Sequence, residues 1–383
     1  MKKAISAAKI FDGNSFLENR TLLIEDGTIL DIVSEPNLDS EWEKYYCTEG
    51  ILAPGFIDWQ VNGGGGLLFN NATTSEAIDI ITSAHHRGGT SSLMPTLITD
   101  TEQQRRTALD SVRASIINGN KSVLGLHLEG PFFSIEKKGV HKQEHIVTMS
   151  DQECAWLCSI ADTVMLLTLA PEKTKVSQLR QLIDAGVIVN IGHSNAESEA
   201  VNQALLAGVK GFTHLFNAMS PATSREPGVV GSALLNDATW CGIIVDGHHV
   251  HPDMVSLAHR IKPRGKLCLV TDAMATVFAD QKSFELYGET ITEIDGRLVN
   301  GEGRLAGACI SMIDAVRIAH KSAGIELGEC LRMASLYSAE YLGLSGTLGM
   351  LSSGHRADLV HFTEHFVVNQ TWVDGEEMLS ANA

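Results

Sequence analysis

Eight short apolar runs, each followed by a more polar stretch, constrain the fold of this chain more than any other feature. The runs lie near residues 55–60, 91–97, 123–128, 164–169, 187–192, 211–215, 241–246 and 267–272. Several intervening stretches have helical periodicity, as in SEAIDIITSAHHRG and AESEAVNQALLAG. Eight buried strands with alternating helices predict an α/β fold, a (β/α)₈ TIM barrel. A doubly wound open sheet is the alternative architecture.

The two ends of the chain differ from this central region. The N-terminal segments AISAAKIFD, TLLIEDG and TILDIVS alternate apolar and polar residues around Gly, Asn and Asp. The C-terminal segments ADLVHF, FVVNQTWVDG and EMLS show the same alternation. Neither end has enough apolar residues for a core of its own. We therefore predict a small composite β-sandwich domain from residues 1–50 plus 351–383, and a catalytic barrel over residues 51–350.

Charge and composition exclude several classes of protein. The formal net charge of −17 opposes binding to nucleic acid, which requires basic patches. No uncharged apolar run reaches the roughly 20 residues that a membrane span requires, and the first residues lack the apolar core of a secretion signal. The seven cysteines form no CxxC pair or regular framework. We expect a cytoplasmic protein with reduced cysteines that binds neither nucleic acid nor membrane.

Residues able to do chemistry stand where five of the apolar runs end. They are Glu129, His193, His214, Asp246 and Asp272. The C-terminal ends of the strands of a barrel meet at one pocket, so these side chains are expected to converge there. A single histidine after a strand is more often a structural residue. Five such positions on different strands are harder to explain in that way.

Glu129, His193 and His214 suit a divalent metal ion. Two imidazoles and one carboxylate leave a coordination position open for water, as catalytic zinc sites require. A bound metal would lower the pKa of that water towards about 7 and polarise a carbonyl oxygen, and Asp272 would lie beside it as a general base. No short metal-binding motif joins these residues, so the prediction depends on the strand pattern.

Nine segments of the chain also match the motifs of one known family, in the same order. They are PGFIDWQVNGGGG (54–66), HLEGPFF (127–133), KKGVH (137–141), GHSNA (192–196), THLFNAM (213–219), SREPG (224–228), DGHHV (246–250), LVTDA (269–273) and LAGA (305–308). Together they resemble the N-acetylglucosamine-6-phosphate deacetylases of the amidohydrolase superfamily. The resemblance implies hydrolysis of the acetamide of N-acetyl-D-glucosamine 6-phosphate to D-glucosamine 6-phosphate and acetate, in amino-sugar catabolism and recycling.

The resemblance assigns roles to the residues at the ends of the strands. It implies that Glu129, His193 and His214 bind one Zn²⁺ per subunit, with Fe²⁺, Co²⁺ or Mn²⁺ as alternatives. It implies that Asp272 is the catalytic acid and base. His141 is then expected to donate a hydrogen bond to the substrate carbonyl and stabilise the oxyanion.

The same resemblance implies a site for the sugar phosphate. Its expected members are Asn217, the backbone N–H of Ala218, Arg225 and His249, with His141 also touching the substrate. In the family the arginine comes from the neighbouring subunit, so the resemblance implies a homodimer in which Arg225 reaches the other active site. The chain has Ser224 where the family has glycine.

One departure from the wider superfamily bears on the number of metals. Many members follow the first barrel strand with a His-x-His pair, whereas this chain has Gln60, Val61 and Asn62. Two ligands of a second metal are therefore missing. We predict a mononuclear site, with Gln60 as an additional contact to the metal or to a bound water.

Two further segments carry no ligand of their own. Gly63 to Gly66 lacks the GxGxxG spacing and the lysine of nucleotide-binding loops, so we interpret it as a close-packed loop at the active site. Residues 274–300 alternate apolar and polar residues and predict a hairpin insertion that covers the site.

Three alternative functions stay open at this point. The first is the same reaction on N-acetylgalactosamine 6-phosphate, which differs in the configuration of one hydroxyl. The second is a cyclic-amide hydrolase of the dihydroorotase or hydantoinase kind, although those enzymes rely on a His-x-His pair and a carboxylated lysine. The third is a catalytically inactive binding protein of amidohydrolase shape, against which the presence of Asp272 and the Glu, His, His set argues.

Overall fold

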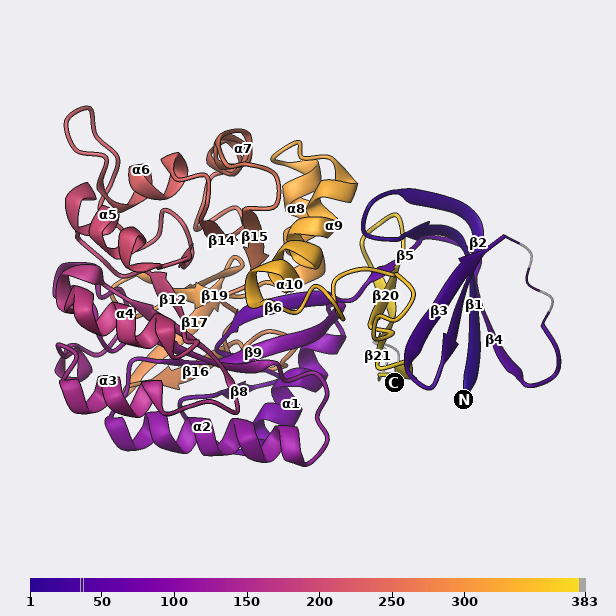
Figure 1. The fold of residues 1–383 in the computed structure, drawn as a ribbon, viewed down its shortest axis with the longest axis horizontal. Coiled ribbons are helices and arrows are strands. Elements are labelled where there is room, and N and C mark those ends of the chain that lie inside the picture. Colours follow the sequence, from indigo (N-terminus) through magenta and orange to yellow (C-terminus); the bar gives the residue numbers. More distant parts are fainter. Residues whose placement is uncertain (35, 37, 379–383) are drawn as a thin grey trace.

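The fold consists of a barrel surrounded by helices and a separate sheet beside it (Figure 1). The computed structural model describes residues 1–34, 36 and 38–378. The first and last strands of the described chain lie in the separate sheet, and the middle of the sequence forms the barrel (Figure 1).

Eight parallel strands form the barrel, in the order β15-β14-β13-β12-β11-β10-β9-β6. They are β6 (Phe56–Val61), β9 (Thr90–Ile98), β10 (Gly125–Glu129), β11 (Val164–Leu169), β12 (Ile188–Ile191), β13 (Gly211–Phe212), β14 (Trp240–Ile244) and β15 (Leu267–Val270). Contacts between the end of β6 and the residues just after β15 close the ring: the Asp272 N–H donates to the Gln60 carbonyl over 3.0 Å, and Val61 bridges to Ala273. The predicted barrel is confirmed, and the open-sheet alternative is wrong.

The strands are almost entirely buried because helices cover the outer face and side chains fill the interior, as expected for a parallel sheet. The helices are α1 (Ser75–His86), α2 (Glu102–Ile117), α3 (Asp151–Cys158), α4 (Val176–Asp184), α5 (Ser198–Ala207), α6 (Gly228–Leu235), α7 (Pro252–Ile261), α8 (Met312–Lys321), α9 (Leu327–Ala334) and α10 (Leu336–Leu342). Thr74, Thr101 and Ser150 cap their N-termini by accepting a backbone N–H. Within the described residues, no helix has the length and hydropathy to cross a membrane.

The separate sheet combines strands from both ends of the chain, and most of its pairings are antiparallel. Its strands are β1 (Lys2–Phe11), β2 (Phe16–Glu25), β3 (Thr28–Val33), β4 (Trp42–Cys47), β5 (Ile51–Pro54), β20 (Leu359–Phe362), β21 (Val368–Val373) and β22 (Glu376–Glu377). Ile5, Leu22, Leu359 and Trp372 share one apolar core, so the two arms of this sheet stabilise each other.

The pairing of the strands refines the predicted boundary between the terminal sheet and the barrel. β5 begins just after the predicted boundary at residue 50, yet it pairs with β20 of the terminal sheet. We therefore propose that the barrel begins after Pro54. Residues 379–383 of the predicted composite domain, which include the end of the EMLS segment, lie outside the described residues.

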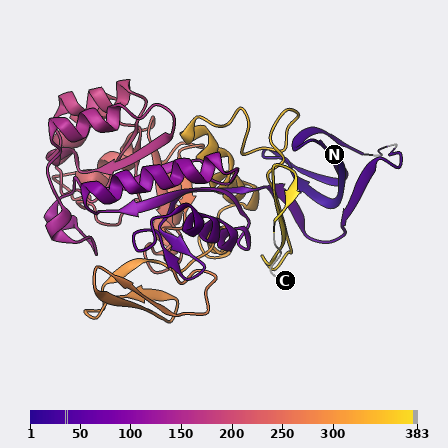
Figure 2. The same cartoon turned by 90° about the horizontal axis from the view of Figure 1, so that it is seen from below.

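An insertion follows β15 at the C-terminal end of the barrel. It is a four-stranded antiparallel sheet of β16 (Ser283–Leu286), β17 (Glu289–Ile294), β18 (Arg297–Val299) and β19 (Leu305–Ala308), whereas the sequence predicted a single hairpin. Its apolar residues pack with Leu68, from the short hairpin of β7 (Gly63–Gly64) and β8 (Leu67–Leu68), and with Ile98. Figure 2 shows this sheet, in orange, projecting from one end of the barrel.

Candidate metal centre and active site

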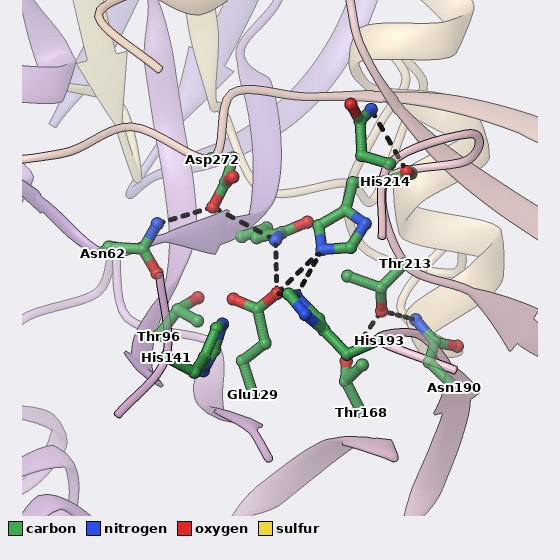
Figure 3. Close-up of polar contacts among 12 residues, drawn as sticks. Asn62, Thr96, Glu129, His141, Thr168, Asn190, His193, Thr213, His214 and Asp272 are labelled. Atoms are coloured by element: carbon green, nitrogen blue, oxygen red, sulfur yellow. Dashed lines mark hydrogen bonds and ion pairs between the residues drawn. The ribbon is translucent and has the colours of Figure 1, made fainter. Parts of the chain in front are cut away.

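Glu129, His193 and His214 converge at the C-terminal end of the barrel (Figure 3). Oε1 of Glu129 lies 3.1 Å from Nε2 of His193 and 2.9 Å from Nε2 of His214, and the two Nε2 atoms are 3.0 Å apart. All three side chains are buried. Among the described residues, no other set of three or more His, Cys, Asp or Glu side chains has this arrangement.

This geometry fits a divalent metal ion. Ligands at 2.0–2.1 Å in a tetrahedral zinc site are about 3.3 Å from one another, close to the separations here. Nδ1 of His193 donates to the Lys137 carbonyl over 2.8 Å, so in the neutral ring Nε2 presents a lone pair to the centre. Oε1 of Gln60 is buried with no hydrogen-bond partner among the described residues, and a nearby cation would satisfy it.

The backbone at this site adopts a conformation that is uncommon outside glycine. His193, His214 and Asp272 have φ values of 48°, 36° and 53°. The left-handed region costs energy for side chains with a Cβ, and it persists where surrounding structure enforces it. Each residue stands just after its strand, so this turn of the backbone directs the side chain into the mouth of the barrel.

Asp272 faces the three ligand residues across the pocket (Figure 3). Its Oδ1 accepts hydrogen bonds from Nδ2 of Asn62 over 2.6 Å and from Nε2 of Gln60 over 3.2 Å. The Gln60 amide also lies 3.3 Å from Oε1 of Glu129, so it connects the predicted base to the predicted ligands. No role for Asn62 was predicted from the sequence. Its position two residues after Gln60, which places both side chains on the same side of the strand, could have indicated a contact with Asp272.

The electrostatics of the pocket follow from burial. Burial opposes ionisation of Glu129, but the close contacts of this carboxyl with the rings of His193 and His214 outweigh burial and hold its pKa well below the usual range. Burial, and then the charge of Glu129, raises the pKa of Asp272. Burial lowers the pKa of His141 well below its usual value, so its ring is neutral. A carboxylate with a raised pKa is suited to accept and return a proton.

The remaining predicted residues mostly line the same cavity, which has a volume of about 170 Å³. His141, Asn217, Ala218 and His249 are all part of its wall. Nδ1 of His249 lies 2.6 Å from Oδ2 of Asp246, which fixes the ring, whereas the neighbouring His248 is exposed. Burial opposes ionisation of Asp246, but the hydrogen bond from His249 is among the contacts that lower its pKa to about 2.

Arg225 is the predicted residue that the chain does not bring to its own cavity. It is exposed, in the loop before α6, and does not line the pocket. The carboxylate of Glu226 accepts the N–H groups of Ser198 and Gly228 and so fixes the loop beside it.

A larger cavity, of about 790 Å³, lies at the other end of the barrel. It is lined by residues at the N-terminal ends of β11, β12 and β14, including Val164, Ile188 and Trp240. No cluster of metal-binding side chains within the described residues faces it. The smaller cavity is therefore the candidate active site, because it lies at the end of the barrel where barrel enzymes place their active sites.

A (β/α)₈ barrel with a buried Glu, His, His set and a carboxylate opposite defines the class of metal-dependent hydrolases. The sequence matches the amidohydrolase family over residues 51–378. The chain belongs to this family, whose members act with metal ions, and it is a hydrolase of amide C–N bonds.

Three relatives are similar over nearly the whole chain. N-acetylgalactosamine-6-phosphate deacetylase of Shewanella sp. (strain ANA-3) is 38% identical, with 98% of this chain and 95% of the relative covered. N-acetylglucosamine-6-phosphate deacetylase of Haemophilus influenzae is 35% identical, with 98% and 99% covered. The crystal structure of N-acetylglucosamine-6-phosphate deacetylase from Pasteurella multocida is 37% identical, has a TM-score of 0.95 and covers 98% of this chain and 99% of its own.

Proposed function

We propose that the chain removes the acetyl group from N-acetyl-D-glucosamine 6-phosphate, giving D-glucosamine 6-phosphate and acetate, in the cytoplasm. The observation that carries the proposal is the meeting of Glu129, His193, His214 and Asp272 at one cavity. The similarity of the whole chain to N-acetylhexosamine-6-phosphate deacetylases supports the substrate class.

We propose that Glu129, His193 and His214 hold one Zn²⁺, with Gln60 beside it. When bound, such an ion lowers the pKa of water and polarises a carbonyl oxygen. Asp272 takes a proton from the attacking water while the oxygen of that water adds to the acetyl carbon. His141 donates to the oxyanion that forms on the carbonyl oxygen. Asp272 then returns the proton to the amide nitrogen as the C–N bond breaks, leaving acetate and the free amine.

Acetate release tests this proposal. The purified protein is assayed on N-acetylglucosamine 6-phosphate and on its galactosamine epimer, before and after chelation and after Zn²⁺ is restored. We expect release that chelation abolishes and Zn²⁺ restores, with the glucosamine substrate preferred. Failure to release acetate from either epimer by metal-loaded protein would contradict the proposal and favour cyclic amides as substrates.

The galactosamine epimer is the second candidate substrate. The Shewanella relative, which is named for N-acetylgalactosamine 6-phosphate, is 38% identical, against 35% for the Haemophilus relative. The ratio of kcat/KM for the two epimers decides between them.

We propose that Asn217, Ala218 and His249 bind the sugar phosphate, and that Arg225 completes the site from the other subunit of a homodimer. Arg225→Ala should raise KM for phosphorylated substrate roughly tenfold or more, because charge-assisted hydrogen bonds contribute about 1.5–3 kcal/mol. The weak reaction with unphosphorylated sugar should change little. Arg260→Ala, which removes another exposed arginine, is the matched control.

Mixed dimers test the subunit crossing directly. Combining Arg225→Ala chains with Asp272→Asn chains creates one site that has both Asp272 and a partner's Arg225. We expect the mixture to regain a low KM at that site. No recovery in mixed dimers, whose formation is checked by tagged co-purification, would place Arg225 outside the neighbouring site.

A further inference from the structure

The two ring nitrogens of His141 have different surroundings. Nδ1 lies 3.3 Å from the backbone nitrogen of Thr99 and 2.8 Å from its Oγ1. A backbone N–H can only donate, so Nδ1 of His141 accepts. The neutral ring therefore carries its hydrogen on Nε2. Nε2 has no hydrogen-bond partner within the described part of the chain, and His141 lines the active-site cavity.

Thr99, the residue that sets this arrangement, is itself held on two sides. On one side, Oγ1 of Thr99 lies 3.2 Å from the Glu129 carbonyl oxygen and 2.8 Å from Nδ1 of His141, so these two acceptors share its single hydrogen. The Ile98 N–H donates to Oδ1 of Asn70 over 3.1 Å, and Nδ2 of Asn70 donates back to the Ile98 carbonyl over 2.9 Å. On the other side, the Tyr287 hydroxyl donates to the Thr99 carbonyl.

Tyr287 comes from the four-stranded insertion rather than from the barrel. It stands in the turn that joins the antiparallel strands β16 and β17, and its backbone has a φ of 53°. Its side chain is mostly buried and lies near the ring of His145, in the loop that also carries His141. The insertion therefore contacts both the strand end that holds Thr99 and the loop that holds His141.

We propose that Thr99 and Tyr287 are positioning residues that fix His141 as an Nε2–H donor directed into the cavity. The value of that donor for catalysis rests on the proposed function, because it stabilises the oxyanion only if an acyl group is hydrolysed there. The four-stranded insertion is then part of the catalytic apparatus, since one of its hydroxyl groups anchors Thr99, the residue that orients His141.

Kinetics of three variants test the proposal. Thr99→Val removes the hydroxyl and keeps the shape, Thr99→Ser keeps the hydroxyl, and Tyr287→Phe removes only the phenol oxygen. We expect Thr99→Val and Tyr287→Phe to lower kcat about tenfold with KM and metal content unchanged, since loss of a whole oxyanion donor costs roughly 10²–10³-fold. Thr99→Ser, which keeps the hydroxyl, should keep kcat close to the wild-type value.

Tyr337→Phe is the matched control, because it removes a hydroxyl that is 2.8 Å from Oε1 of Glu329, away from the site. It should leave kcat unchanged. If Tyr287→Phe and Thr99→Val alter only thermal stability, or if Tyr337→Phe lowers kcat equally, the two residues have a structural role alone and the proposal is overturned.

A spectroscopic measurement separates this proposal from the choice of substrate. Long-range ¹H–¹⁵N correlation on zinc-loaded protein labelled at histidine, with the His141→Asn variant for assignment, reports the tautomer without any turnover. We expect a protonated Nε2 and an unprotonated Nδ1 for His141. Thr99→Val keeps only the backbone N–H as a donor to Nδ1, so it should show a larger fraction of the other tautomer. A protonated Nδ1 in the wild-type protein would overturn the proposal even if the enzyme hydrolyses the expected substrate.

Discussion

Replacing Asp272 with asparagine should lower kcat for N-acetylglucosamine 6-phosphate by about 10³-fold, with the fold and the bound metal retained. General acid–base catalysis contributes roughly 10²–10⁴-fold, and this carboxylate acts both in the attack of water and in the departure of the amine. The amide has the same shape and still accepts the hydrogen bond from Asn62, but it cannot take up a proton. Steady-state kinetics, metal analysis and thermal unfolding measure the three quantities.

Asp237→Asn is the control for this experiment, because that carboxylate is exposed, precedes the N-terminal end of β14 and does not line the active-site cavity. It should behave as the wild-type protein. A fully active Asp272→Asn variant would eliminate the acid and base role. An inactive variant that has also lost its metal would instead place Asp272 among the ligands.

Glu129→Gln should remove both the metal and the activity. Oε1 of Glu129 is the atom that contacts both histidines, and its negative charge offsets part of the charge of a divalent ion. The loss in metal affinity should exceed the about 10–100-fold typical of residues that only support a ligand. After dialysis against a weak chelator, metal analysis should find an essentially empty protein, and kcat should fall at least about 10³-fold.

A second buried glutamate gives the matched control. Glu153 forms a buried ion pair with Arg105 at 2.7 Å and is no part of the cavity. Glu153→Gln weakens that pair and should lower stability, since breaking a buried pair costs about 3–5 kcal/mol, while metal content stays normal. Retention of metal by Glu129→Gln would show that the two histidines bind it without this carboxylate.

Local patterns in the sequence were enough to predict the barrel and the metal-binding set. The apolar runs mark strands because a buried parallel strand needs apolar side chains on both faces. The positions of Glu129, His193, His214 and Asp272 after such runs then follow from the rule that strand ends in a barrel converge. These features depend on short-range periodicity and on one general property of the fold, so no contact had to be known in advance.

Other features depend on contacts between distant segments, which no local pattern encodes. β13 is only two residues long, because the backbone leaves the extended conformation before His214 and turns that ring inward. The insertion has four strands, since β19 lies beyond the predicted hairpin segment of residues 274–300 and pairs with β18 inside that segment. β5 joins the terminal sheet because its partner β20 comes from the other end of the chain.

The sequence by itself determined the fold class, because the strands are recognisable from their apolar runs. It also predicted the metal ligands and the base, because each of them is tied to the end of such a strand. Only the tertiary structure shows three hydrogen bonds at the site. Asn62 donates to Asp272, the Thr99 N–H donates to His141, and Tyr287 donates to the Thr99 carbonyl. Each of these contacts joins residues that are 42 to 210 positions apart. Hydrogen bonds are short and directional, so they form only after packing has brought such segments together.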